Sequence, residues 1–296
     1  MALVPMPTLL ADARAGGYAV GYFEAWDLAS LEAVVEAAEA ERSPVVLGFG
    51  CLLVDQGWLD RGGIEVLGRI GRTIAERACV PTCLLLNETH SSAQAVRGLH
   101  AGFEAVMLHT DGSLDSVDDV RALVQMAHAR GAAVEGELGE LPEARGPEIV
   151  EAGSSLTDPD EAAAFVEGTG VDCLAVSVGN VHLLQGRTAD VDLDRLEEIQ
   201  RRVDVPLVVH GGTGFPPEAV GDAIARGVAK FNVGTALKQA FLDGVEDALS
   251  SRPGGLGPHD LVGSHGSADL LEAGKARMVP VVRGLIRLYG SAGRAS

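Results

Sequence analysis

The stretch VPLVVHGGTGFPPEAVGDAIARGVAKFNVGT, residues 205–235, contains two predicted strands that each end in a small polar loop. Residues 207–209 form a short apolar run typical of a buried parallel strand, and His210 follows directly before a glycine-rich turn. Residues 228–233 form the second strand, and an amphipathic helical pattern follows each of the two. Strand, loop and helix in this order are typical of parallel β/α folds.

Both loops have the composition of an anion site. Glycine-rich loops that lead into helices expose unpaired backbone N–H groups, and these groups bind phosphate. In an eightfold parallel barrel the usual phosphate site lies in the loops after strands seven and eight. Glycine clusters are most often ordinary turns, so neither loop alone is decisive. Their pairing, with His210 between strand and glycines, favours a functional site.

The rest of the chain alternates short apolar runs with amphipathic helical patterns, which predicts repeated β/α units. Eight strands are expected, at residues 20–23, 45–49, 82–86, 105–108, 132–138, 173–178, 207–209 and 228–233. We therefore predict a single (β/α)8 TIM barrel, an α/β fold spanning residues 1–296; a doubly wound open sheet is the alternative. The irregular stretch 139–157 is interpreted as a mobile active-site loop, and additional C-terminal helices are expected from about residue 267.

Composition narrows the classes of partner. The 296 residues are 47% hydrophobic and carry a formal net charge of −19, which argues against nucleic acid and anionic membranes as partners. No apolar run approaches membrane-spanning length, and the first residues lack the pattern of a signal peptide, so we expect a cytoplasmic protein. The four cysteines have neither metal-ribbon nor disulfide-framework spacing and are interpreted as free thiols.

In a barrel of this kind the active site lies where the strands end. Eleven polar residues are expected there: Glu24, Asn87, Glu88, His109, Asp111, Glu135, Glu137, Asn180, His182, His210 and Asn232. His182 and His210 follow adjacent strands, so their rings can converge on one point. Neutral imidazoles backed by carboxylates suit Zn²⁺, Mn²⁺ or Fe²⁺, and we predict a divalent metal site.

At this point the sequence resembles the class II, metal-dependent ketose-bisphosphate aldolases of the fructose- and tagatose-bisphosphate type. The resemblance covers nearly the whole chain. Its motifs are SPVVL (43–47), AHARGAAVEGELG (127–139), TDPDEAAAFVEGTGVDCLAVSVGNVH (157–182), VPLVVHGGTG, GVAKFNVGT and IRLYGSAGRA (286–295). It implies a (β/α)8 fold, a homodimer or homotetramer, and reversible aldol cleavage of a phosphorylated substrate that gives dihydroxyacetone phosphate.

The resemblance also implies roles for individual residues. His182 and His210 match metal ligands, Glu137 matches an acidic position associated with the site, and Glu88 could complete the set. The expected ion is Zn²⁺, with Mn²⁺ or Fe²⁺ as alternatives, and a monovalent cation is allowed beside it. The ion would polarise the ketone and stabilise the enediolate as a Lewis acid. The substrate and its phosphate are assigned to Gly179, Gly211, Gly212, Thr213, Asn232, Gly234 and Thr235.

Departures from the family pattern are concentrated at the catalytic end. The family's Asp-His pair after the third strand is Asn87-Glu88 here, and an amide cannot donate and recover a proton as a carboxyl group does. Glu24 replaces an asparagine, His109 an aspartate and Leu183 a phosphate-binding glycine. The candidate catalytic residues are therefore Asn87, Glu88, Glu24, His109 and Glu137.

Three functions remain open on this sequence. The first is a divergent class II aldolase-like lyase acting on a phosphorylated or phosphonate-like ketose or a substrate of the dihydroxyacetone phosphate type. The second is a metal-dependent isomerase, epimerase or oxidative enzyme for the same substrate class. The third is a non-catalytic, ligand-binding member of the family. The retained histidines and phosphate loops favour the first.

Overall fold

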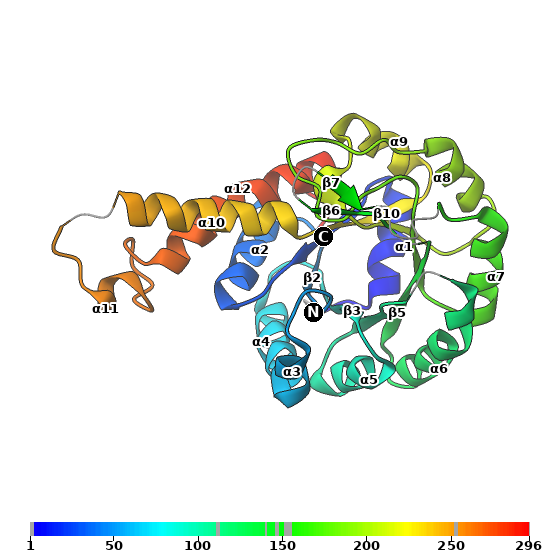
Figure 1. The fold of residues 1–296 in the computed structure, drawn as a ribbon, viewed down its shortest axis with the longest axis horizontal. Coiled ribbons are helices and arrows are strands. Elements are labelled where there is room, and N and C mark those ends of the chain that lie inside the picture. The colour runs from blue at the N-terminus through cyan, green and yellow to red at the C-terminus, as the bar shows by residue number, and fades with distance from the viewer. Residues whose placement is uncertain are drawn as a thin grey trace.

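Eight parallel strands close into a barrel in a computed structural model that describes residues 3–110, 113–139, 141–145, 148–150, 156–251 and 254–295. The order around the barrel is β1-β10-β9-β8-β5-β4-β3-β2 (Figure 1). The strands are β1 (Val20–Glu24), β2 (Val45–Gly50), β3 (Thr82–Thr89), β4 (Ala105–Leu108), β5 (Ala133–Leu138), β8 (Cys173–Val176), β9 (Leu207–Val209) and β10 (Val228–Val233). This confirms the predicted (β/α)8 fold and excludes the open sheet.

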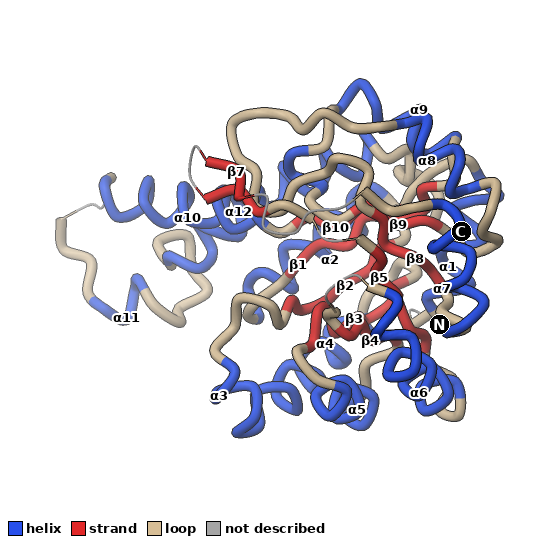
Figure 2. The backbone as a smooth tube through the Cα atoms, turned by 45° about the vertical axis from the view of Figure 1, so that its right-hand side comes forward, coloured by secondary structure: helices blue, strands red, loops and turns tan. Residues whose placement is uncertain are grey.

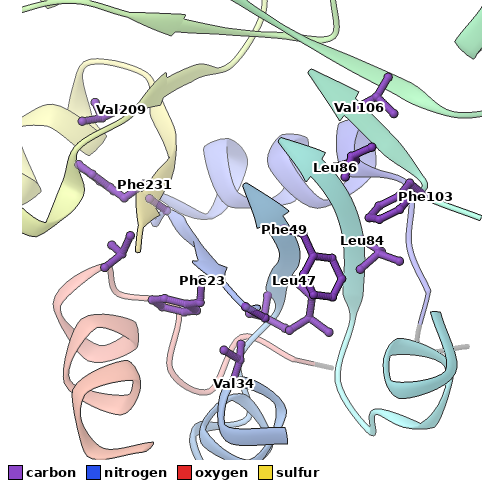
Figure 3. Packing of buried hydrophobic residues seen from close by; sticks show 14 of the residues in the cluster. Phe23, Val34, Leu47, Phe49, Leu84, Leu86, Phe103, Val106, Val209 and Phe231 are labelled. Atoms are coloured by element: carbon purple, nitrogen blue, oxygen red, sulfur yellow. The ribbon is translucent and has the colours of Figure 1, made fainter. Parts of the chain in front are cut away.

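The core between strands and outer helices follows from the alternation of side chains along each strand. Phe23, Leu47, Leu84 and Phe231 point outward from their strands and are fully buried against the surrounding helices. Figure 3 shows this layer, including Val34 of the first outer helix. The alternate residues of the same strands face the barrel interior, and the last of these reach the carboxyl-terminal mouth.

Helices follow the strands and form the outer ring. They are α2 (Leu28–Glu41), α3 (Gln56–Trp58) with η1 (Leu59–Gly63) and α4 (Ile64–Arg77), α5 (Ser92–Ala101), η2 (Leu114–Ser116) with α6 (Val117–His128), α7 (Pro159–Thr169), α8 (Leu193–Gln200), η3 (Gly212–Gly214), η4 (Pro217–Ala219) with α9 (Val220–Ala225), and α10 (Thr235–Ser250). Aspartate or serine caps begin several of them; Asp27, for example, accepts the backbone N–H of Ser30 at α2.

A helix that the sequence reasoning did not anticipate closes the opposite end of the barrel. α1 (Met6–Gly16) buries Met6, Leu9 and Leu10 against the inward residues that begin the strands, such as Val20 and Cys173. Figure 1 shows α1 inside the ring of outer helices. The barrel interior is therefore sealed by apolar packing at this end, and polar residues gather at the other.

The segment 139–157 contains ordered strand pairing in its described part. β6 (Glu143–Arg145) and β7 (Glu148–Val150) form a two-stranded antiparallel sheet, which stands apart from the barrel strands in Figure 2. The sequence pattern predicts an irregular stretch here, because strands of three residues are too short to show a detectable period. Backbone hydrogen bonds join its beginning to His182: the His182 N–H donates to Pro142 and the His182 carbonyl accepts from Ala144.

The C-terminal part adds α11 (Pro258–Leu261) and α12 (Leu270–Leu288). α12 packs against α10 and α2, and Figure 1 shows α10 and α12 side by side, projecting from one side of the barrel. The tail returns to the barrel, where Gly293 and Ala295 donate backbone hydrogen bonds to the end of α2. Within the described ranges, no helix combines the length and apolar character that crossing a bilayer requires.

Candidate metal and anion site

Two histidines and one glutamate converge at the carboxyl-terminal mouth of the barrel. His210 follows β9 directly, His182 lies in the segment after β8, and Glu88 belongs to β3. One ligand atom from each of the three lies within 4.8 Å of the others. The two imidazole rings are stacked with centroids 5.8 Å apart and an interplanar angle of 28°. The rings of His182 and His210 therefore approach a common point.

The backbone at the end of β3 aims Glu88 at this point. The pairing of β3 with β4 shifts register between Leu86 and Thr89, and Glu88 has a φ of 56°, in the left-handed region. A bulge of this kind redirects a side chain at the rim of a sheet, and a non-glycine residue with positive φ is strained. The surrounding fold maintains this strained conformation, which brings the carboxylate to the histidines.

Carboxylates surround His210 and fix its orientation. Its Nε2 lies 2.9 Å from Glu135 Oε1, and its Nδ1 lies 3.4 Å from Glu88 Oε1 and 3.4 Å from Glu137 Oε1. At the shorter contact the Nε2–H group donates a hydrogen bond to Glu135, and Nδ1 faces the other carboxylates. A carboxylate that accepts a hydrogen bond from the distal nitrogen of a ligand histidine is the usual support of a metal site.

The residues present fit a divalent ion. His182 Nε2 and His210 Nδ1 are buried and have no hydrogen-bond partner in the described part of the chain, although buried polar atoms are normally paired. Together with the Glu88 carboxylate they make a donor set of two imidazole nitrogens and carboxylate oxygen, which suits Zn²⁺, Mn²⁺ or Fe²⁺. The orphaned nitrogens and the donor chemistry thus agree.

The protonation of the cluster without metal reflects the same contacts. Burial alone would raise the pKa of Glu88, but its interactions with His210 and the other histidines outweigh burial and lower that pKa to about 2. For His210, burial lowers the pKa, yet Glu135, Glu88 and Glu137 together raise it to about 10. Without metal, negative carboxylates therefore surround a cationic imidazole. A metal cation can take the place of this positive charge.

Glu137 and His109 form a second, neighbouring pair. Glu137 Oε2 lies 3.7 Å from His109 Nδ1, and Glu137 lies outside the three-residue group that could share one ion. Interaction with the Glu137 carboxylate raises the pKa of His109, against the lowering effect of burial. The pair offers a titratable imidazole beside the candidate metal site.

A cavity of about 340 Å³ opens at the mouth of the barrel beside the histidines. Ten of the residues assigned from the sequence line it: Glu24, Asn87, Glu88, His182, His210, Gly211, Thr213, Asn232, Gly234 and Thr235. Asn87 Oδ1 and Asn232 Nδ2 are buried there and have no hydrogen-bond partner among the described residues. Apolar, small polar and charged side chains therefore line one cavity, which has the size of a metabolite site.

Several expected site residues lie elsewhere. His109 and Glu137 are not among the residues that line this cavity. Gly179 and Gly212 do not line it either, and a Cβ at Gly179 would lie 2.2 Å from the Asp190 carbonyl oxygen. At Gly212 it would meet the Asn232 carbonyl at 2.8 Å. These two glycines permit close backbone approaches behind the cavity. Asp111, also expected at a strand end, lies outside the described residues.

Sequence reasoning gave no role to Lys230 or Tyr22 and none in particular to Glu135. Lys230 is fully buried in the barrel, with Nζ 2.8 Å from Glu135 Oε2 and donating to Asn232 Oδ1 at 2.6 Å. Tyr22 lies beside it and lines the cavity, with a buried hydroxyl that has no partner. The two-residue spacing of Lys230 and Asn232 could have placed Lys230 inside, because Asn232 was already expected to face the site.

This geometry agrees with comparisons to known proteins. The family model for fructose-bisphosphate aldolase class-II matches residues 4–294. This chain belongs to the class II fructose-bisphosphate aldolase family. Membership of this family supports lyase activity in general and a dependence on divalent metal, which class II aldolases share.

Solved structures show the same relationship. The chain is similar to the YdjI aldolase from Escherichia coli K12, with 27% identity, a TM-score of 0.80 and coverage of 99% of this chain and 100% of that chain. A candidate fructose-1,6-biphosphate aldolase from Coccidioides immitis is 26% identical, with a TM-score of 0.80 and coverage of 98% and 97%. Fructose-bisphosphate aldolase from Campylobacter jejuni shares the fold at 21% identity, with a TM-score of 0.76 and coverage of 98% and 96%.

Proposed function

We propose that this protein is a divergent metal-dependent lyase that cleaves a carbon–carbon bond in a phosphorylated, or phosphonate-like, ketose of the dihydroxyacetone phosphate type. The observation that carries the proposal is the convergence of Glu88, His182 and His210 within 4.8 Å, beside a cavity lined by the loops after β9 and β10. The ketone end of the substrate would lie at the histidines. Its anionic end would lie on Gly211, Thr213, Gly234 and Thr235.

Glu88, His182 and His210 would hold the divalent ion, for which we propose Zn²⁺ first and Mn²⁺ or Fe²⁺ as alternatives. The bound ion supplies Lewis acidity toward the substrate ketone. Glu135 orients the His210 ring, and Asn180 donates to the backbone carbonyl of His210 at 2.9 Å, which anchors the backbone at this position. Asn232 Nδ2 is free to donate a hydrogen bond to the substrate. A monovalent cation beside the anionic group is a further part of the proposal.

The proton carrier of this site is assigned to the His109–Glu137 pair. Asn87 occupies the place of the family's acid, and its amide cannot exchange a proton. His109 titrates, its pKa is raised by Glu137, and its side chain is 37% exposed. We therefore propose that this pair takes the proton of the substrate hydroxyl from which cleavage begins, from its position beside the candidate metal site and outside the cavity lining, with Glu137 stabilising the protonated His109 ring.

The same pair favours one alternative, a metal-dependent isomerase or epimerase for the same substrate class. Proton transfer to and from carbon needs a titratable group and a polarised ketone, whereas cleavage also needs an acid at the Asn87 position or its replacement. The alternative predicts exchange of the substrate α-proton without cleavage.

The deciding experiment is turnover of phosphorylated ketoses by the full chain, loaded with Zn²⁺, Mn²⁺ or Fe²⁺, with NMR detection of both products and deuterium exchange. We expect cleavage products and α-proton exchange of dihydroxyacetone phosphate in D₂O, both abolished by a chelator and restored by metal. Exchange without cleavage would establish the alternative. Binding of phosphate esters without exchange or cleavage under any metal would make this a non-catalytic family member.

We further propose a cytoplasmic homodimer or homotetramer. The four cysteines are all free, as in proteins of reducing compartments. α10 exposes Leu242 and Leu249 at 53% and 49%, a feature typical of a surface that another subunit covers. Light scattering on the purified chain tests the assembly.

A further inference from the structure

An ion pair occupies the anionic side of the cavity. Lys238, in the first turns of α10, has its Nζ 2.6 Å from Glu24 Oε1, at the end of β1. The Lys238 ammonium also lies 5.9 Å from the centroid of the Trp26 ring. Among the described residues that line the cavity, Lys238 is the only lysine or arginine. Within this described lining, the one fixed cation that could bind an anionic ligand is therefore already paired.

Two glycines make room for the Glu24 side chain. A Cβ at Gly234 would lie 2.0 Å from Glu24 Oε2, and a Cβ at Gly50 would lie 3.1 Å from Glu24 Oε1. The carboxylate is thus held against the loop at which α10 begins, where a side-chain cap is absent and where the helix favours negative charge. Glu24 itself fills the position that suits an anion.

A second observation is an unpaired buried donor on the same side. Asn232 is 93% buried and lines the cavity, and its Nδ2 has no hydrogen-bond partner among the described residues, whereas its Oδ1 accepts from Lys230. Its free N–H groups require an acceptor that the protein does not provide. The site thus combines an unused donor with a lysine that an internal carboxylate neutralises.

We propose that Glu24 and Lys238 are the specificity-determining pair of the anion subsite: Lys238 binds the phosphate of the substrate, and Glu24 is an internal competitor that keeps free phosphate out. This inference rests on the proposed function, since it assigns the substrate's phosphate to the cavity described there. A ligand must displace the carboxylate from the lysine before its own anion can bind.

The competition between Glu24 and phosphate for Lys238 distinguishes a phosphate that is attached to a bound ketone from free phosphate. A phosphate carried on a ketone that is held at the histidines reaches Lys238 at the high effective concentration of an intramolecular group, whereas free phosphate competes at its bulk concentration. Burial raises the pKa of Glu24 although Lys238 acts in the opposite direction, so its ionised form is not strongly stabilised by the pair. Displacement of the carboxylate is therefore accessible to a tethered phosphate.

The test compares binding of inorganic phosphate and dihydroxyacetone phosphate by calorimetry, on the full chain with its resident metal. For Glu24→Gln we expect about tenfold tighter binding of inorganic phosphate, equivalent to about 1.4 kcal/mol, and a smaller gain for dihydroxyacetone phosphate. For Lys238→Met we expect weaker binding of both. In the double variant Glu24→Gln/Lys238→Met the gain should disappear, because the lysine that Glu24 releases is absent.

Glu32 and Lys275 provide matched controls, since they form a Glu–Lys pair at 3.3 Å between α2 and α12 and do not line the cavity. Glu32→Gln and Lys275→Met make the same charge changes on this acidic protein and should alter phosphate affinity less than twofold. Equal effects of Glu24→Gln and Glu32→Gln, or a gain that persists in the double variant, would overturn the proposal. Phosphate binding needs no turnover, so an inactive protein that shows these shifts would refute only the proposed lyase function.

Discussion

The two sides of the cavity differ in what their polar groups lack. On the metal side, His182 and His210 each have a buried nitrogen without a partner, and carboxylates stand 3.4 Å away from His210 Nδ1. On the anion side, Glu24 and Lys238 satisfy each other at 2.6 Å. One side is therefore preorganised to bind a cation, while on the other side the Glu24 carboxylate occupies the lysine that an anionic ligand would use. Substrate recognition should depend on the first side for affinity and on the second for selectivity.

Removal of His210 should have the largest effect, because it takes away a donor and leaves Glu88, Glu135 and Glu137 without the imidazole between them. For His210→Ala we expect loss of bound metal and a fall in turnover of about a thousandfold or more, the scale of losing an essential catalytic group. Elemental analysis and steady-state kinetics measure both. His265→Ala, at an exposed histidine paired with Glu272, is the control and should keep metal and activity. Retained metal in His210→Ala would contradict the assignment.

An intermediate effect is expected at Lys230, which joins the two sides from beneath through Glu135 and Asn232. For Lys230→Met we expect zinc affinity to fall by about 10- to 100-fold, as when the support of a ligand histidine is lost. Competition with a chelating dye measures this. If Lys230→Met does not fold, the double variant Glu135→Gln/Lys230→Met replaces it, because the double variant leaves no unpaired buried charge. We expect the same fall in zinc affinity in the double variant. Unchanged zinc affinity in the folded double variant would show that Lys230 does not support the metal ligands.

The smallest effect is expected far from both sides, at Glu41, where α2 meets α12. Hydrogen bonds from Arg287 and Arg283 lower the pKa of the Glu41 carboxyl. A lowered folded-state pKa stabilises the protein above the ordinary glutamate pKa and ceases to do so as the pH falls through the folded-state value. Because the pair is at the surface, we expect Glu41→Gln to lower the melting temperature at pH 7 by about 2 °C or less.

That difference between wild type and Glu41→Gln should vanish in acid, while phosphate and zinc affinities at pH 7 stay at their wild-type values. Calorimetric melting across the pH range measures it. A variant that lost zinc or gained phosphate affinity would show that the contrast between the two sides is not local to the cavity.

The barrel and the convergence of His182 and His210 could be predicted from the sequence, because both depend on residues at strand ends. Each strand was found within a few residues, and His182 and His210 converge as expected from adjacent strands. It could not predict that Glu24 binds Lys238, since the two are 214 positions apart and meet only through closure of the barrel between β1 and β10. It also missed α1, whose apolar pattern has no neighbouring strand to suggest its place.

The Asn87-Glu88 substitution illustrates a further limit. The sequence showed the change of residue types, but the direction of Glu88 depends on a bulge and a positive φ, which its neighbours impose through pairing with β4. The resemblance also assigned Gly179 to the substrate; its backbone approaches Asp190 and does not line the cavity, and its role in substrate binding stays a prediction. Local backbone shape, which residue type alone does not encode, decides where both residues lie.

The close fit of Glu24 against Gly234 makes the two positions epistatic. A residue with a Cβ at 234 would meet Glu24 Oε2 at 2.0 Å, so the carboxylate would have to leave its place against the loop. The effect of a substitution at 234 should therefore depend on the residue at 24, and a shorter side chain at 24 should make a Cβ at 234 easier to accommodate.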